Sequence, residues 1–255
     1  MTNPHGSFIW YELLTTDPAA AARFYGSLLG WTEAPHGGPD GGPVPGYSIL
    51  SHGGQAIGGL MQAPEGVPPV WLGYVAVEDV DAAVADIQAA GGAVQMPARD
   101  IGGVGRIAMV ADPRGAPFYV MRGSSDRASV SFDAEAIGHC AWQQLSTSDA
   151  EAAIDFYAGR FGWKRGEALP MGPSGAYQLM ELQGRPFGAI MPRQDAAPPH
   201  WAFVFRVARI GEAAQLVPEG GGTIVYGPAE VPGGDHVIFG LDPQGALFAV
   251  IGKPG

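Results

Sequence analysis

The chain has 255 residues, a formal net charge of −11 and a hydrophobic content of 46%. Its 14 Lys and Arg residues are scattered, which argues against nucleic acid and anionic membrane surfaces as partners, because both reward clustered positive charge. A single cysteine, Cys140, excludes an intramolecular disulfide and a multi-cysteine zinc site. The N-terminus has no signal-peptide pattern and no run approaches about 20 apolar residues, so we expect a cytoplasmic protein.

The first 62 residues predict a strand, a helix and three further strands. An aromatic-rich run at 8–14 predicts the first strand, and Asp17-Pro18 predicts the start of a helix that ends at Gly30. The next strands are expected at 31–33, 47–51 and 56–61. A loop rich in Gly and Pro is expected over 35–46.

The same order then repeats within the first half. A strand is expected at 71–77, and Val80, Val84 and Ile87 predict one face of a helix that ends at 91–92. Three strands follow, at 93–96, 106–111 and 118–122. The first half of the chain therefore contains two βαβββ modules.

The second half repeats the first. Residues 23–31 read RFYGSLLGW and residues 155–163 read DFYAGRFGW, at an offset of 132. At an offset of 130, Pro-Pro-x-Trp recurs at 68–71 and 198–201, and Asp-Pro-x-Gly-Ala recurs at 112–116 and 242–246. A strand at 140–145, a helix after Asp149 and a helix through Ile210, Ala214 and Val217 follow the same plan. We therefore predict four modules in two pairs, with a first domain at 1–123, a polar linker at 124–136 and a second domain at 137–255.

These repeated motifs, over 8–122 and 137–252, resemble the vicinal oxygen chelate superfamily, which contains glyoxalases, bleomycin-resistance proteins and extradiol dioxygenases. The chain is most similar to fused two-domain glyoxalase-like proteins of bacteria. The resemblance implies an α+β fold with tandem glyoxalase-like domains, in which four βαβββ modules in two pairs form curved, cup-shaped mixed sheets. It does not imply one activity, because metal-dependent lyases, isomerases and dioxygenases share this fold with antibiotic-binding proteins.

The resemblance also implies where metal ligands would lie, as a His/Glu/Gln set on the first, fourth, fifth and eighth strands of a module pair. The matching positions are Trp10, Gly59, Leu72 and Tyr119 in the first half, and Trp142, Ala189, Ala202 and Ala249 in the second. None is a usual metal ligand, so we expect no metal and no other cofactor. A shift of two residues keeps a strand's face and would bring Glu12, Gln144 and His200 to the cups, which leaves open a weak divalent-metal site. Otherwise Glu12 and Gln144 orient hydrogen bonds in a pocket for an organic ligand.

The two halves differ at the cup positions. Leu72 and Tyr119 would fill one cup, whereas Ala202 and Ala249 would leave the other open, with His200 on the strand face of Ala202. We expect only the second cup to bind a ligand. Glu12 would join it if the halves exchange strands, and Gln144 if they do not.

The leading hypothesis is that the protein binds a small apolar or aromatic molecule without a metal. Trp10 and Trp142 suit stacking against such a ligand, although core packing explains them equally well. The expected ligand-binding residues are Trp10, Glu12, Gly59, Trp142, Gln144, Ala189, His200, Ala202 and Ala249.

Two other functions remain open. One is a lyase, isomerase or dioxygenase with Glu12 and His200 as catalytic candidates at a divalent ion. The other is a structural or signalling protein with vestigial cups. The chain is expected to act as a monomer or a homodimer. His139 and Cys140 are neighbours on a strand and so face opposite ways, which favours an inert buried cysteine over a nucleophile.

Overall fold

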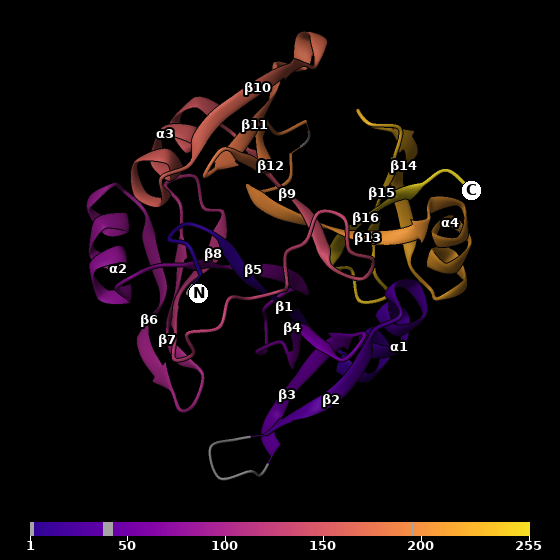
Figure 1. Cartoon of the computed structure of the whole chain (residues 1–255), viewed down its shortest axis with the longest axis horizontal. Coiled ribbons are helices and arrows are strands. Elements are labelled where there is room, and N and C mark those ends of the chain that lie inside the picture. The colour runs from indigo at the N-terminus through magenta and orange to yellow at the C-terminus, as the bar shows by residue number, and fades with distance from the viewer. Residues whose placement is uncertain (1–2, 38–42, 195) are drawn as a thin grey trace. The chain divides into compact units, whose positions relative to one another are not determined.

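The computed structural model describes residues 3–37, 43–194 and 196–255 (Figure 1). The first module comprises β1 (Phe8–Thr15), α1 (Pro18–Leu29), β2 (Thr32–Gly37), β3 (Pro43–His52) and β4 (Gln55–Gln62). The second comprises β5 (Val70–Ala76), α2 (Val80–Ala89), β6 (Ala93–Ile101), β7 (Gly105–Ala111) and β8 (Pro117–Gly123). The third comprises β9 (Cys140–Thr147), α3 (Ala150–Phe161), β10 (Lys164–Pro170), the short 3₁₀ helix η1 (Gly172–Ser174), β11 (Ala176–Leu182) and β12 (Arg185–Pro192). The fourth comprises β13 (His200–Arg209), α4 (Ile210–Glu219), β14 (Thr223–Glu230), β15 (His236–Leu241) and β16 (Leu247–Lys253).

The strands form two mixed sheets of eight, in the orders β2-β3-β4-β1-β5-β8-β7-β6 and β10-β11-β12-β9-β13-β16-β15-β14. In each module the first and last strands pair in parallel, and the remaining pairs are antiparallel. Each sheet takes all its strands from one half of the chain, so the halves do not exchange strands between sheets. The predicted α+β class and the four βαβββ modules in two pairs are confirmed.

One prediction about the first module was wrong. The expected loop over 35–46 is shorter, because β2 continues to Gly37 and β3 begins at Pro43. Pro35 still pairs with Ser48, since β2 is the edge strand of its sheet, where a missing N–H is tolerated. The remaining loop positions, 38–42, lie outside the described residues.

The first helix of each half begins and ends where its sequence predicts. The carboxylate of Asp17 accepts a hydrogen bond from the backbone N–H of Ala20 at 3.0 Å, and Asp149 caps α3 in the same way at 3.1 Å. Gly30 and Gly162 end these helices with φ of 68° and 69°, in the left-handed region that glycine adopts without a steric cost. None of the four helices in the described part of the chain is long and apolar enough to cross a membrane.

The described chain divides into two compact units, and each takes one module from each half. The first unit contains residues 1–9, 73–129 and 143–201, and in it α2 packs against α3 (Figure 1). The second contains residues 10–72, 130–142 and 202–255, and in it α1 packs against α4 (Figure 1). The repeated halves of the sequence and the compact units are therefore different divisions of the chain.

The repeated motifs meet in the core of each unit. In the second unit the Tyr25 hydroxyl donates to Asp242 at 3.0 Å and accepts from the indole N–H of Trp71 at 2.9 Å. The first unit has the same chain of bonds, from Trp201 to Tyr157 and from Tyr157 to Asp112, each at 3.2 Å. Each tyrosine motif of one half is thus completed by the Asp-Pro-x-Gly-Ala motif of the other half.

Burial governs the ionisation of these groups. Desolvation raises the pKa of Asp112 and Asp242, and it raises the pKa of Tyr25 and Tyr157 as well. The second carboxylate oxygen of each aspartate accepts backbone N–H groups of its own turn, from Arg114 and Ala116 in one unit and from Gln244 and Ala246 in the other. These bonds make the two triads structural elements of the core.

Candidate functional site

The strand register of the fourth module places a row of small and apolar side chains on one sheet face. Val204 on β13 pairs with Ala249 on β16, which pairs with Phe239 on β15. The alternate residues Phe203 and Phe205 point the other way, into the core, where their rings lie 5.1 Å from Tyr11 and 5.0 Å from Trp31 respectively. Since side chains alternate along a strand, the Val204 row lies on the face opposite that core.

This face carries a cluster of apolar side chains, which we call the Ala249 face. Its buried members are Val204, Val237 and Ala249, and the half-buried Trp142, Val231, Phe239 and Ile251 pack against them. Ala249 is completely buried, yet its neighbours keep contact with solvent. Two expected ligand-binding residues, Trp142 and Ala249, are thereby brought together within the second unit. Ala202 is also buried in this unit, two positions before Val204 on the same strand.

The first module brings together three more of the expected residues, on the other sheet. Glu12 on β1 pairs with Gly59 on β4, and Glu12 is only 3% exposed. The half-buried Trp10 donates its indole N–H to the Tyr47 hydroxyl at 3.0 Å. A side chain at Gly59 would collide with that hydroxyl, so the glycine is what lets Trp10 and Tyr47 meet over the strand.

Tyr47 was not singled out by sequence reasoning, although a signal existed. Tyr177 stands 130 residues later, so this tyrosine is repeated like the recognised motifs. The repeat at this tyrosine is hard to recognise because the residues on either side of it differ between the two halves, Gly46 and Ser48 against Ala176 and Gln178.

The second module has large side chains at the equivalent row. Tyr74 pairs with Tyr119, and their rings stack with centroids 4.2 Å apart and an interplanar angle of 12°. Tyr119 in turn pairs with Met109. Leu72, the residue expected to fill this position with Tyr119, is buried in the second unit rather than the first.

The third module supplies an amide in place of a carboxylate. Gln144 pairs with Ala189, which pairs with Leu179, and all three belong to the first unit. Gln144 is half-buried and Ala189 is 1% exposed. His200 starts β13, and its Nδ1 lies 2.9 Å from the carbonyl oxygen of Pro198.

These rows do not fit the divalent metal that the fold family implies. Glu12 is the one carboxylate among them, and the residue paired with it on β4 is Gly59, which has no side chain to offer as a ligand. Within the described ranges, no group of three or more His, Cys, Asp or Glu side chains is arranged to hold a metal ion. A catalytic divalent ion needs about three protein ligands with an open position, and the described residues do not supply such a set.

Cys140 is 1% exposed, and its thiol donates to the carbonyl oxygen of Trp142 at 3.3 Å. Burial raises the pKa of this thiol to about 12. The expected burial of Cys140 is confirmed. Because the thiolate is the reactive form of cysteine, its inertness stays a prediction that this raised pKa favours.

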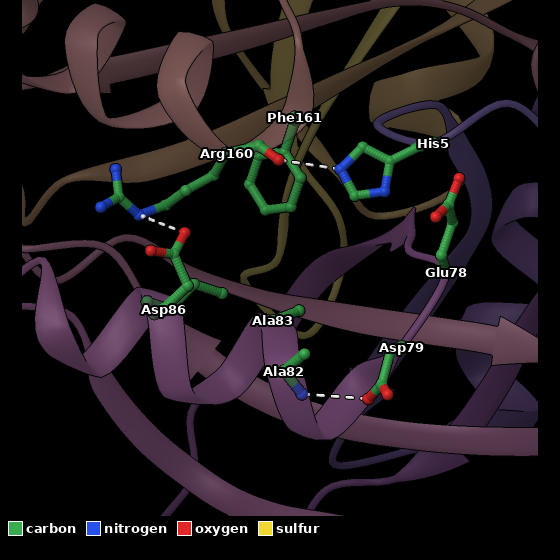
Figure 2. Close-up of a pocket in the computed structure, with 9 residues that line it drawn as sticks. His5, Glu78, Asp79, Ala82, Ala83, Asp86, Arg160 and Phe161 are labelled. Carbon is green, nitrogen blue, oxygen red and sulfur yellow. Dashed lines mark hydrogen bonds and ion pairs between the residues drawn. The ribbon is translucent and has the colours of Figure 1, made fainter.

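Figure 2 shows residues that line a different hollow, between α2 and α3 of the first unit. The volume of this hollow is about 250 Å³. Its polar groups already bind one another: Nε2 of His5 lies 2.8 Å from the carbonyl oxygen of Arg160, and Nε of Arg160 lies 3.3 Å from Asp86. The Asp79 carboxylate caps α2 through the backbone N–H of Ala82. A neighbouring hollow of about 360 Å³ is also lined by Arg160. The sequence does not mark any of these residues as functional. The ion pair between Arg160 on α3 and Asp86 on α2 indicates that this hollow is part of the packing contact between the two helices.

Comparison with known proteins agrees with a chain of two glyoxalase-like domains. Residues 10–121 match the family model described as a glyoxalase-like domain, and residues 136–250 match that of the glyoxalase/bleomycin resistance protein/dioxygenase superfamily. The chain therefore belongs to the glyoxalase/bleomycin resistance protein/dioxygenase superfamily, as a protein with two such domains.

Relatives of similar length support this membership. CFP32 of Mycobacterium tuberculosis, which carries a provisional glyoxylase name, is 34% identical over 96% of this chain and 94% of its own. The anthracycline biosynthesis protein DnrV of Streptomyces peucetius is 31% identical over 96% of this chain and 93% of its own. Among solved structures, the Mn(II)-bound glyoxalase from Novosphingobium aromaticivorans has a TM-score of 0.66 at 17% identity, over 100% of this chain and 83% of that one. That last likeness concerns the fold alone.

Proposed function

We propose that the protein binds a small apolar or aromatic molecule on the Ala249 face, without a metal ion. The observation that carries the proposal is the set of half-buried Trp142, Phe239 and Ile251 around the fully buried, small Ala249. Binding sites for organic ligands are mostly apolar and aromatic, and an alanine leaves room where a larger side chain would fill the face.

The difference between the halves supports the same choice. Tyr119 stands 130 residues before Ala249, and its ring is stacked on Tyr74. Side chains thus occupy the first-half position that Ala249 leaves small. The name of the relative DnrV adds support of another kind, since anthracyclines are flat aromatic molecules.

The proposal is tested with 2-naphthamide, a neutral aromatic probe. The protein is first treated with a chelator to remove any metal, and its affinity for the probe is then measured by titration calorimetry. Phe239→Ala removes a ring from the Ala249 face and should weaken binding about tenfold, since loss of about 1.4 kcal/mol corresponds to that factor. The matched control is Met109→Ala, because Met109 is the half-buried residue 130 positions earlier. Equal losses in both variants, or binding that needs added Mn²⁺ or Zn²⁺, would contradict the proposal.

A second candidate, a metal-dependent lyase, isomerase or dioxygenase, is favoured by the buried carboxylate of Glu12 alone. It requires near-stoichiometric metal in protein purified without chelator, together with loss of that metal in Glu12→Gln. Protein that is purified without chelator and contains no stoichiometric metal would contradict it.

A further inference from the structure

We infer that the ligand of the Ala249 face carries an acidic group and that Arg206 binds this group; the inference rests on the proposed function. Arg206 pairs with Ile251, which pairs with Val237, so these three side chains form the row beside that of Val204, Ala249 and Phe239. Arg206 is also two residues beyond Val204 on β13, which places both on the same face. A guanidinium therefore borders a surface that is otherwise apolar.

The guanidinium of Arg206 is held in place and retains free donors. Its Nε donates to the carbonyl oxygen of Ala134 at 2.6 Å, and its Nη1 donates to Asp235 at 2.9 Å. Within the described residues Nη2 has no hydrogen-bond partner, and it is not among the polar atoms cut off from solvent. A fixed arginine with two unused N–H groups suits an anionic oxygen, because little side-chain entropy remains to be lost on binding.

The charges around Arg206 leave an excess of one positive charge. Asp235 also binds Lys253, whose ammonium nitrogen lies 2.7 Å from the carboxylate. Lys253 and Arg206 together lower the pKa of Asp235, so this carboxylate stays ionised and compensates one of the two cations. In a chain with a net charge of −11, this cluster favours an anion at the border of the Ala249 face.

The cluster belongs to the second half only. At the offset of 130, Arg206, Asp235 and Lys253 correspond to Ala76, Gly105 and Gly123. The register confirms the comparison, because Ala76 pairs with Met121 as Arg206 pairs with Ile251. The charged cluster and the small Ala249 are therefore both found in the second half and not at the matching positions of the first. An aromatic or aliphatic carboxylate is the ligand class that would place its apolar part on the Ala249 face and its acidic group at Arg206.

A purely structural role is the alternative, because Arg206 also ties Ala134 to the loop that contains Asp235. A structural arginine would affect stability without changing the preference between a charged and an uncharged ligand. The ratio of two affinities thus separates the two roles.

The experiment compares 2-naphthoate with 2-naphthamide, which has the same rings and no charge. Wild-type protein should bind the naphthoate about tenfold more tightly, the usual size of a charge-assisted hydrogen bond. Arg206→Met should abolish this preference, which is measured as the ratio of the two affinities and so does not depend on the affinity for 2-naphthamide itself. Lys253→Met removes the same charge from a side chain that is 67% exposed and should lower the preference by less than Arg206→Met does, because water screens the charge of Lys253 and it is not inferred to contact the ligand.

The double variant Arg206→Met/Asp235→Leu gives the same readout if the single variant fails to fold, because it removes the ion pair as a unit. Equal binding of both probes to wild-type protein, or an unchanged preference in the Arg206 variants, would overturn the inference while leaving the proposed function intact. Failure of wild-type protein to bind either probe would instead refute the proposed function and, with it, the inference.

Discussion

The triad of Tyr25, Asp242 and Trp71 yields a prediction about stability. Tyr25→Phe removes one hydroxyl and retains the ring, which packs edge-on against Phe248 at 5.9 Å and against Trp71 at 5.3 Å. The change therefore tests the hydrogen bonds and leaves the packing in place.

The magnitude follows from what the missing hydroxyl leaves behind. One carboxylate oxygen of Asp242 and the indole N–H of Trp71 would both lose their partner while buried. Each orphaned group costs about 1–3 kcal/mol, so Tyr25→Phe should lower the free energy of unfolding by about 2–6 kcal/mol. Against a typical total of about 5–15 kcal/mol, that is a large fraction.

Urea denaturation followed by circular dichroism measures the loss. Tyr226→Phe is the matched control, because Tyr226 is 59% exposed in the same unit, and it should change stability by less than about 0.5 kcal/mol. Tyr157→Phe should cost as much as Tyr25→Phe, and the two losses should add because the triads share no residue. If Tyr25→Phe were no more costly than Tyr226→Phe, the argument that the repeated motifs are joined by buried hydrogen bonds would be refuted.

Three further predictions concern ionisation, backbone sterics and reactivity. Because the pKa values of Asp112 and Asp242 are raised, these carboxyl groups stay protonated in the folded state above pH 3.8, the ordinary pKa, where the unfolded state has released its protons. The free energy of unfolding should therefore fall as pH rises through the folded-state pKa values. A double variant, Asp112→Asn with Asp242→Asn, should show a flatter dependence of stability on pH, and an unchanged dependence would contradict desolvation as the cause. Gly138→Ala should be strongly destabilising, because Gly138 has a φ of 79° and a Cβ at this position would collide with the ring of His52. Measured by thermal unfolding, adding His52→Ala to this variant should restore part of the lost stability, and no restoration would contradict the steric reason. Cys140 should resist a thiol reagent in native protein and react fully in urea, and fast native labelling would contradict its burial.

Much of the fold could be predicted from the sequence because the repeat is expressed in short local motifs. Asp17 with Pro18 and Gly30 determine the ends of α1 through bonds to their own neighbours, so their effect is visible without any tertiary contact. The partners of Tyr25 were not predictable in this way. Asp242 lies 217 residues away, and neither side of that bond has a local signature of its partner.

The candidate site shows the same division. The contrast between Tyr119 and Ala249 was visible by aligning the two halves, since it needs only the offset of 130. Arg206 was not noticed, because its role depends on a register that pairs it with Ile251 and on the distant Asp235. Periodicity indicates which strand carries a residue and which face it takes, whereas the neighbours on that face are set by pairing between strands.

A crystal structure of the metal-free protein with 2-naphthamide would test the central claim most directly. The account predicts the naphthalene rings on the Ala249 face, in contact with Phe239 and Trp142 and with no metal at Glu12. Rings bound beside Tyr119, or in the hollow between α2 and α3, would contradict it.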